Sequence, residues 1–176
     1  MAAATETPIR PERILCATDF TPCSRRALEY AVALARPARA ELAVLHVLPF
    51  PLPSVDSDDE PDWMPAGPGG RSEVLERMRR FAAPAEAAGL PTRLLVREGI
   101  PGDEILRVAA DLEPDLIVMG SHGRRGLSRL LGSQAARVLH KAPCPLLTVS
   151  LAGDGTTEGA VRLHVSPGGP APSPAA

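Results

Sequence analysis

A glycine-rich segment in the last third of the chain carries the residues best suited to hold a ligand. Residues 119–133 read MGSHGRRGLSRLLGS, after the apolar run 116–118 and before the sequence QAARVL at 134–139. A glycine-rich turn between a strand and a helix exposes backbone N–H groups, and the positive end of the helix dipole adds to them. The segment also contains three arginines. These features predict an anion site, with phosphate as the natural guest.

The elements that position this segment alternate between strand and helix. Continuous apolar runs predict strands over residues 14–18, 41–48, 92–96, 116–119 and 145–149. Apolar residues at helical spacing predict helices from Pro22 to a stop at Pro37, around 74–85 with a kink or early end at Pro84, over 105–112 and over 134–139. The alternation predicts an α/β fold, a five-stranded parallel sheet with helices on both faces.

Ligands of such sheets bind at the carboxyl ends of the strands, where the strand order reverses. Thr18 and Asp19 follow the first strand, and Gly120 and Ser121 follow the fourth. The sheet geometry and the glycine-rich segment therefore predict the same place for the site.

The composition changes on both sides of the domain expected at 13–150 and in one loop within it. We expect a flexible leader at 1–12, a mobile loop at 49–72 and a disordered tail at 151–176, because these stretches are rich in Pro, Gly and small residues. Residues 161–165 alternate like a strand but have no evident partner, and they stay unassigned.

Charge, aromatic content and cysteine usage limit the classes of function. A net charge of −2 and 3% aromatic residues disfavour a nucleic-acid partner. Three cysteines without a CxxC pair indicate a reducing compartment and no zinc site. The sequence has neither a signal-peptide pattern nor an 18-residue apolar run, so we expect a cytoplasmic protein with no membrane contact.

Several short segments carry a family resemblance. ILCATDF at 14–20, LHV at 45–47 and GIP at 99–101 are similar to the opening strand, the second strand and the turn before the third helix of the universal stress protein family. The resemblance spans roughly residues 11–150. It implies a Rossmann-like fold of the adenine nucleotide alpha-hydrolase type. It also implies a homodimer through the last strand, Pro145 to Val149, which is apolar and expected at the sheet edge.

The nucleotide-binding members of this family carry a spaced glycine pattern. In this pattern a glycine, two residues and a second glycine are followed by nine further residues and then by glycine and Ser or Thr. Gly120 and Gly123 match the beginning and Gly132-Ser133 the end, but only eight residues, 124–131, lie between. One residue fewer in a helical approach rotates the residues after it by about 100°, unless the turn at Gly126 absorbs the change.

The resemblance implies a site for ATP or another adenine nucleotide, with or without Mg²⁺. Asp19 would hold the ribose hydroxyls or a water near the adenine, and Ala17, Val47 and Met119 would line the base. Backbone N–H groups would surround the ribose and the phosphates. The expected nucleotide-binding residues are Ala17, Thr18, Asp19, Val47, Met119, Gly120, Ser121, His122, Gly123, Gly132, Ser133 and Gln134.

Each of these residues also has a plainer interpretation. Asp19 is typical of a turn after a strand. Gly120 and Gly123 are compatible with tight packing alone, and Gly132-Ser133 with a helix cap. The arginine pair at 124–125 is either a phosphate clamp or a solvated face. His46 and His122 lack partners at metal-ligand spacing, which disfavours a metal site.

The leading hypothesis is a stress-response protein that acts by binding an adenine nucleotide and signalling, with at most slow ATP hydrolysis. The sequence lacks a G-x-S-x-G elbow, a Walker motif and a GxGxxG after the first strand, which disfavours a hydrolase, an NTPase and a dehydrogenase. The alternative is a non-nucleotide-binding interaction protein on the same scaffold. Its dimer surface or its 49–72 loop would then contact a protein partner.

Overall fold

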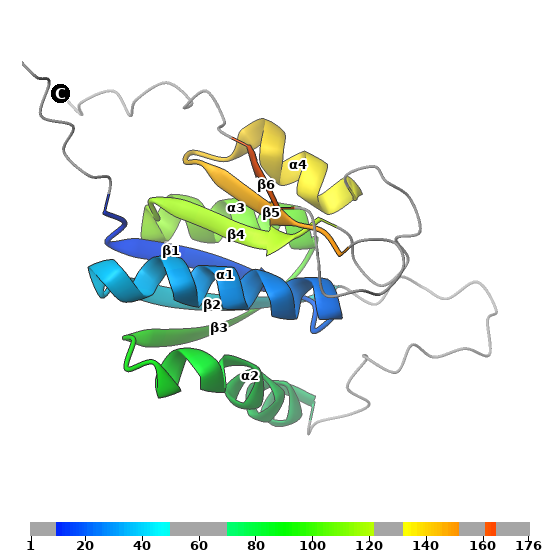
Figure 1. The fold of residues 1–176 in the computed structure, drawn as a ribbon. Coiled ribbons are helices and arrows are strands. Elements are labelled where there is room, and N and C mark those ends of the chain that lie inside the picture. Colours follow the sequence, from blue (N-terminus) through cyan, green and yellow to red (C-terminus); the bar gives the residue numbers. More distant parts are fainter. Residues whose placement is uncertain (1–9, 50–69, 122–131, 152–160, 165–176) are drawn as a thin grey trace, which may run out of the picture.

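The computed structural model describes residues 10–49, 70–121, 132–151 and 161–164 of this chain. Strands and helices alternate along it up to the fifth strand (Figure 1). The elements are β1 (Arg13–Thr18), α1 (Pro22–Ala38), β2 (Glu41–Leu48), α2 (Gly70–Ala87), β3 (Thr92–Glu98), α3 (Pro101–Leu112), β4 (Leu116–Gly120), α4 (Ser133–Lys141), β5 (Leu146–Val149) and β6 (Val161–His164).

The strands form one sheet in the order β3-β2-β1-β4-β5-β6. The first five are parallel, as the alternation predicts, and β6 pairs antiparallel with β5. The chain builds outward from β1 to β3, crosses back to β4, and continues outward on the other side. The strand order therefore reverses between β1 and β4.

Two layers of helices cover the sheet (Figure 1). Apolar residues of α1 and α2 pack with one set of sheet residues, among them Ile14 and Val44. Those of α3 and α4 pack with the other set, among them Leu15 and Leu45. Alternate residues of each strand thus face opposite layers, and both faces of the sheet are buried, which explains the continuous apolar runs.

The helix ends differ from the sequence prediction. The expected stop of α1 at Pro37 is wrong, because the helix continues to Ala38 and ends at Arg39, which adopts a left-handed conformation with φ of 53°. The Arg39 and Ala40 amides donate to carbonyls of the last turn, so Pro37 fits inside a capped end. Helix α2 also continues through Pro84 to Ala87. Its start at Gly70 corrects the predicted 49–72 loop, since residues 70–72 are helical.

The C-terminal segment adds a strand that the sequence did not assign. Residues 161–164 form β6, paired from Val149↔Val161 to Leu146↔His164. The predicted tail at 151–176 is therefore not wholly irregular, and β5 is not the sheet edge that we expected. The alternation of apolar and polar residues over so few positions was too short to predict a strand. Whether this segment forms one depends on pairing with β5, which is distant in sequence.

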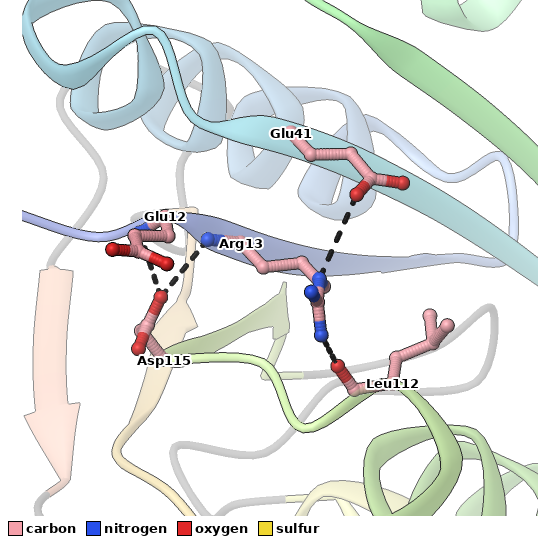
Figure 2. Close-up of polar contacts among 5 residues, drawn as sticks. All are labelled: Glu12, Arg13, Glu41, Leu112 and Asp115. Carbon is pink, nitrogen blue, oxygen red and sulfur yellow. Dashed lines mark hydrogen bonds and ion pairs between the residues drawn. The ribbon is translucent and has the colours of Figure 1, made fainter.

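Polar contacts join the amino-terminal ends of the central strands, opposite the expected site (Figure 2). The Asp115 carboxylate, just before β4, accepts hydrogen bonds from the backbone N–H groups of Glu12 at 2.7 Å and Arg13 at 2.9 Å. The Arg13 guanidinium donates to the Leu112 carbonyl oxygen and lies 3.6 Å from Glu41 Oε2. These contacts connect β1 to the starts of β2 and β4 and so fix the strands that carry the site.

The buried thiol of Cys16 makes the free energy of unfolding depend on pH in the alkaline range. Burial raises the pKa of Cys16, on β1, from 9.0 to about 12. Above pH 9 the unfolded chain loses this proton while the folded protein keeps it, so the free energy of unfolding falls as pH rises. The slope approaches about 1.4 kcal/mol per pH unit for this one thiol. In urea unfolding between pH 8 and 11, the free energy of unfolding should fall more steeply with pH in the natural protein than in Cys16→Ala; parallel curves would contradict this.

Candidate functional site

The carboxyl ends of β1 and β4 meet at the point where the strand order reverses. The two strands pair in register with Ala17 opposite Met119, and β2 lies on the other side of β1 with His46 opposite Thr18. Open parallel sheets hold their ligands at such a point. The structure therefore brings the residues after the first and fourth strands together, as the sequence predicted.

Three apolar side chains form a wall at this edge. Ala17, Val47 and Met119 belong to the core on the α3–α4 side of the sheet. Each is 7% exposed, whereas neighbouring core residues such as Leu15 and Leu45 are 0% exposed. The three lie at the rim of the core, where a flat apolar ligand group laid on them would cover their remaining surface.

Hydrogen bonds of Thr18 stabilise the turn after β1. Its hydroxyl donates to Ser24 Oγ at 3.0 Å and accepts from the Phe20 N–H at 3.0 Å. Its carbonyl oxygen lies 2.7 Å from His46 Nδ1, and since a carbonyl only accepts, Nδ1 carries the proton of that bond. The sequence missed Ser24 in this network, because only the fold brings the first turn of α1 over the end of β1.

Asp19 builds the turn that starts α1. Its Oδ1 accepts from the Thr21 N–H at 3.0 Å and from the Thr21 hydroxyl at 2.6 Å. Thr21 in turn caps α1, accepting from the Ser24 N–H at 3.3 Å. The interpretation of Asp19 as a turn residue is confirmed. The same bonds hold a carboxylate at the edge where the ribose was expected, and that second role stays a prediction.

Gly120 lets the end of β4 approach α1 closely. A Cβ atom there would lie 3.1 Å from Cys23 Cβ and 3.2 Å from the Ser24 backbone nitrogen. The next residue, Ser121, is 6% exposed, and its N–H donates to the Val149 carbonyl at 2.7 Å. Packing is therefore one reason for glycine at position 120.

The start of α4 is fixed beside the end of β4. The Gly132 N–H donates to the Ser121 carbonyl at 2.8 Å, and the Gly132 carbonyl accepts from Ala136 at 2.8 Å, the first bond of the helix. The N–H groups of 133–135 precede that bond, and the N-cap Gly132 has no side chain to accept from them. They form an anion-attracting helix end at the predicted edge. His122 and Gly123, also predicted for the site, lie outside the described residues.

Gln134 turns its side chain toward α3. Its Oε1 accepts from the Gly102 N–H at 2.8 Å, in the first turn of α3. A ligand role for Gln134 would therefore use its backbone N–H rather than its side-chain oxygen. Nothing in the local sequence indicated this link, which depends on how α3 and α4 pack.

The assembled edge offers an apolar wall, a carboxylate and helix N–H donors, which suits a ligand with a flat ring, hydroxyls and an anionic group. In the described parts of the chain, no group of three or more His, Cys, Asp or Glu side chains is arranged to hold a metal ion. Nor does any helix there combine the length and apolar character needed to cross a bilayer.

Known proteins show the same fold and family. The model of the universal stress protein family matches residues 11–150. The universal stress protein MJ0531 of Methanocaldococcus jannaschii is 34% identical over 139 residues, which cover 78% of this chain and 81% of that protein. The universal stress protein UspA from Lactobacillus plantarum superimposes with a TM-score of 0.64 at 24% identity, over 80% of this chain and 98% of that one.

Two solved relatives hold adenine nucleotides. A universal stress protein in complex with cAMP superimposes with a TM-score of 0.61 at 23% identity, over 80% of this chain and 98% of that chain. A family member from Arabidopsis thaliana with AMP bound gives 0.55 at 22% identity, over 83% and 96%. At these identities the two structures establish the fold alone. The match of the family model to residues 11–150 and the 34% identity to MJ0531 show that this chain belongs to the universal stress protein family.

Proposed function

We propose that this universal stress protein binds an adenine nucleotide, ATP in the first place, at the carboxyl edge of β1 and β4. The observation that carries the proposal is the convergence there of the Ala17–Val47–Met119 wall with the bare N-terminus of α4. The cAMP and AMP complexes of relatives with this fold support the choice of ligand.

Each part of the edge has a task in this proposal. The apolar wall excludes water from the base, and the Asp19 carboxylate accepts hydrogen bonds from the ribose hydroxyls. The N–H groups that begin α4 donate to phosphate oxygens, in concert with the glycine-rich segment. Mg²⁺ would accompany the phosphates of ATP and neutralise part of their charge.

The protein would act by binding and signalling, with at most slow hydrolysis. Asp19 is the carboxylate at this edge, and its Oδ1 already accepts two hydrogen bonds from Thr21. A carboxylate held in this way is suited to position a ligand rather than to accept a proton from an attacking water.

Asp19→Asn separates the ligand role of this carboxylate from its turn role. The amide keeps an oxygen for Thr21 but loses the charge, and charge-assisted hydrogen bonds are about twice as strong as neutral ones. We expect a slightly lower melting temperature, because the two Thr21 bonds also lose the charge, and an ATP affinity about tenfold lower, measured by calorimetry. Asp111→Asn, on the exposed side of α3, is the matched control. Equal ATP affinities of the two variants would contradict the assignment.

One observation favours the alternative of an interaction protein. The Gln134 side-chain oxygen already accepts a hydrogen bond from the Gly102 N–H, so it does not face a nucleotide. The two functions differ in what the purified protein carries. Adenine absorbance released on denaturation supports nucleotide binding. Protein that contains no nucleotide and does not bind added ATP supports the interaction protein.

We also propose a homodimer through β5, formed when β6 leaves the sheet. β6 pairs with β5 along the side on which a partner strand would add, so the two arrangements exclude each other. A chain that ends at Leu151 exposes the apolar β5 edge. We expect its dimer to be at least tenfold tighter than that of the full chain, measured by sedimentation. An equal or weaker dimer would contradict this proposal.

A further inference from the structure

A hollow lies beside α1 and α2, on the other face of the sheet from the proposed base wall. It has a volume of about 450 Å³ and is lined by Phe20, Arg25, Glu73, Arg77, Arg80 and Phe81. Phe20 and Phe81 belong to the core on the α1–α2 side, whereas Ala17, Val47 and Met119 belong to the α3–α4 side. We call this hollow the arginine pocket; its volume suits a small organic ligand.

The arginine pocket holds uncompensated positive charge. Its lining has three guanidinium groups and one carboxylate. In the same two helices, Arg26 pairs with Glu29 and Arg79 pairs with Glu76. Among the described residues, by contrast, no carboxylate lies within ion-pair distance of the three pocket arginines. The charges on the pocket side are thus left to attract an anion.

Aromatic rings hold two of these guanidinium groups in place. Arg77 lies 4.4 Å above the centre of the Phe20 ring, and Arg25 lies 5.2 Å above that of Phe81. The two rings meet edge to face at 5.6 Å. Stacked guanidinium groups keep their N–H edges available for a planar or tetrahedral anion.

Phe20 is positioned by the turn after β1. It has φ of 63°, a left-handed conformation that is uncommon for an aromatic residue. The hydrogen bond from its N–H to Thr18 and the Asp19–Thr21 bonds on either side hold this conformation. The half-buried ring contacts His46 at 4.3 Å and forms an apolar wall of the pocket.

We propose that the arginine pocket binds a phosphate monoester of an aromatic alcohol, as a site separate from the nucleotide edge. The phosphate would accept hydrogen bonds from Arg25, Arg77 and Arg80, which carry more charge than a carboxylate ligand requires. The aromatic group would lie against the half-buried Phe20 ring, where ring packing adds to the affinity.

The test is a titration of the full chain with phenyl phosphate, followed by calorimetry, with phenol and inorganic phosphate in parallel. We expect phenyl phosphate to bind at least tenfold more tightly than either. Arg77→Gln and Arg25→Gln should each weaken it at least tenfold, and the paired residues' variants Arg79→Gln and Arg26→Gln should leave it unchanged. Thermal melts confirm that each variant is folded.

Three results would overturn the proposal. They are no saturable binding of phenyl phosphate, equal affinity for inorganic phosphate, or equal losses in the pocket variants and their controls. Met119→Ala, in the proposed base wall on the other face of the sheet, distinguishes this site from the nucleotide edge. Unchanged phenyl phosphate affinity in that variant supports a separate site, and a loss comparable to that of Arg77→Gln contradicts it. Neither outcome depends on whether ATP binds.

Discussion

Gly120→Val is expected to lower the free energy of unfolding by about 1–3 kcal/mol and to weaken ATP binding at least tenfold. A Cβ at this position meets the Cys23 Cβ at 3.1 Å, the Ser24 nitrogen at 3.2 Å and the Cys23 carbonyl carbon at 3.3 Å. Two of these atoms are backbone, in a helix turn held by the Thr21 cap and by the Thr18–Ser24 bond. They cannot swing aside as a flexible side chain would, and the branched side chain adds further volume, so the cost is that of overpacking.

The same contact explains the expected loss of binding. If the end of β4 moves away from α1, it also moves relative to Ala17 on β1, with which Met119 pairs. The wall and the helix end would no longer face one ligand. Gly120→Ala is the graded control, with a smaller effect on both quantities. Urea unfolding and ATP calorimetry measure them; a valine variant as stable and as tight as the natural protein would show that this approach is not required.

Phe81→Ala is expected to have the largest effect on stability, about 3–5 kcal/mol, because a large ring is removed from the core. Phe81 is 2% exposed and packs in the α1–α2 core. Its ring also supports Phe20 and lies beneath Arg25. Little can collapse into the space, since strands β1 and β2 back the core on the sheet side.

Phe81→Leu is the matched control for this prediction. It keeps an apolar side chain of similar reach, so we expect a loss below about 1.5 kcal/mol. Urea denaturation at constant pH measures both variants. A loss for Phe81→Ala no greater than that for Phe81→Leu would contradict the view that ring volume stabilises this helix layer.

Much of the fold could be predicted because both sides of the sheet are buried. The apolar runs of β1, β2 and β4 and the helical spacing in α3 each have one consistent interpretation. The predicted helix stop at Pro37 was wrong, because a proline in the last turn of a helix is tolerated. The helix ends two residues later at Arg39, in a left-handed cap. β6 was missed because its stability comes from β5, which is remote in sequence.

The candidate site was predictable where it depends on topology and unpredictable where it depends on side-chain partners. Parallel strands with reversing order necessarily bring Asp19 and Gly120 to one edge. No local pattern showed that Gln134 would bond to Gly102, or that Arg25 of α1 would share a pocket with Arg77 of α2. Such contacts join elements far apart in sequence, and helix packing decides them.

The central claim, adenine-nucleotide binding at the β1–β4 edge, is tested most directly by calorimetric titration of the full chain with ATP in the presence of Mg²⁺. We predict saturable binding of one nucleotide per chain, a raised melting temperature, and an affinity that falls about tenfold in Asp19→Asn but not in Asp111→Asn. No heat and no thermal stabilisation up to millimolar ATP would contradict the claim.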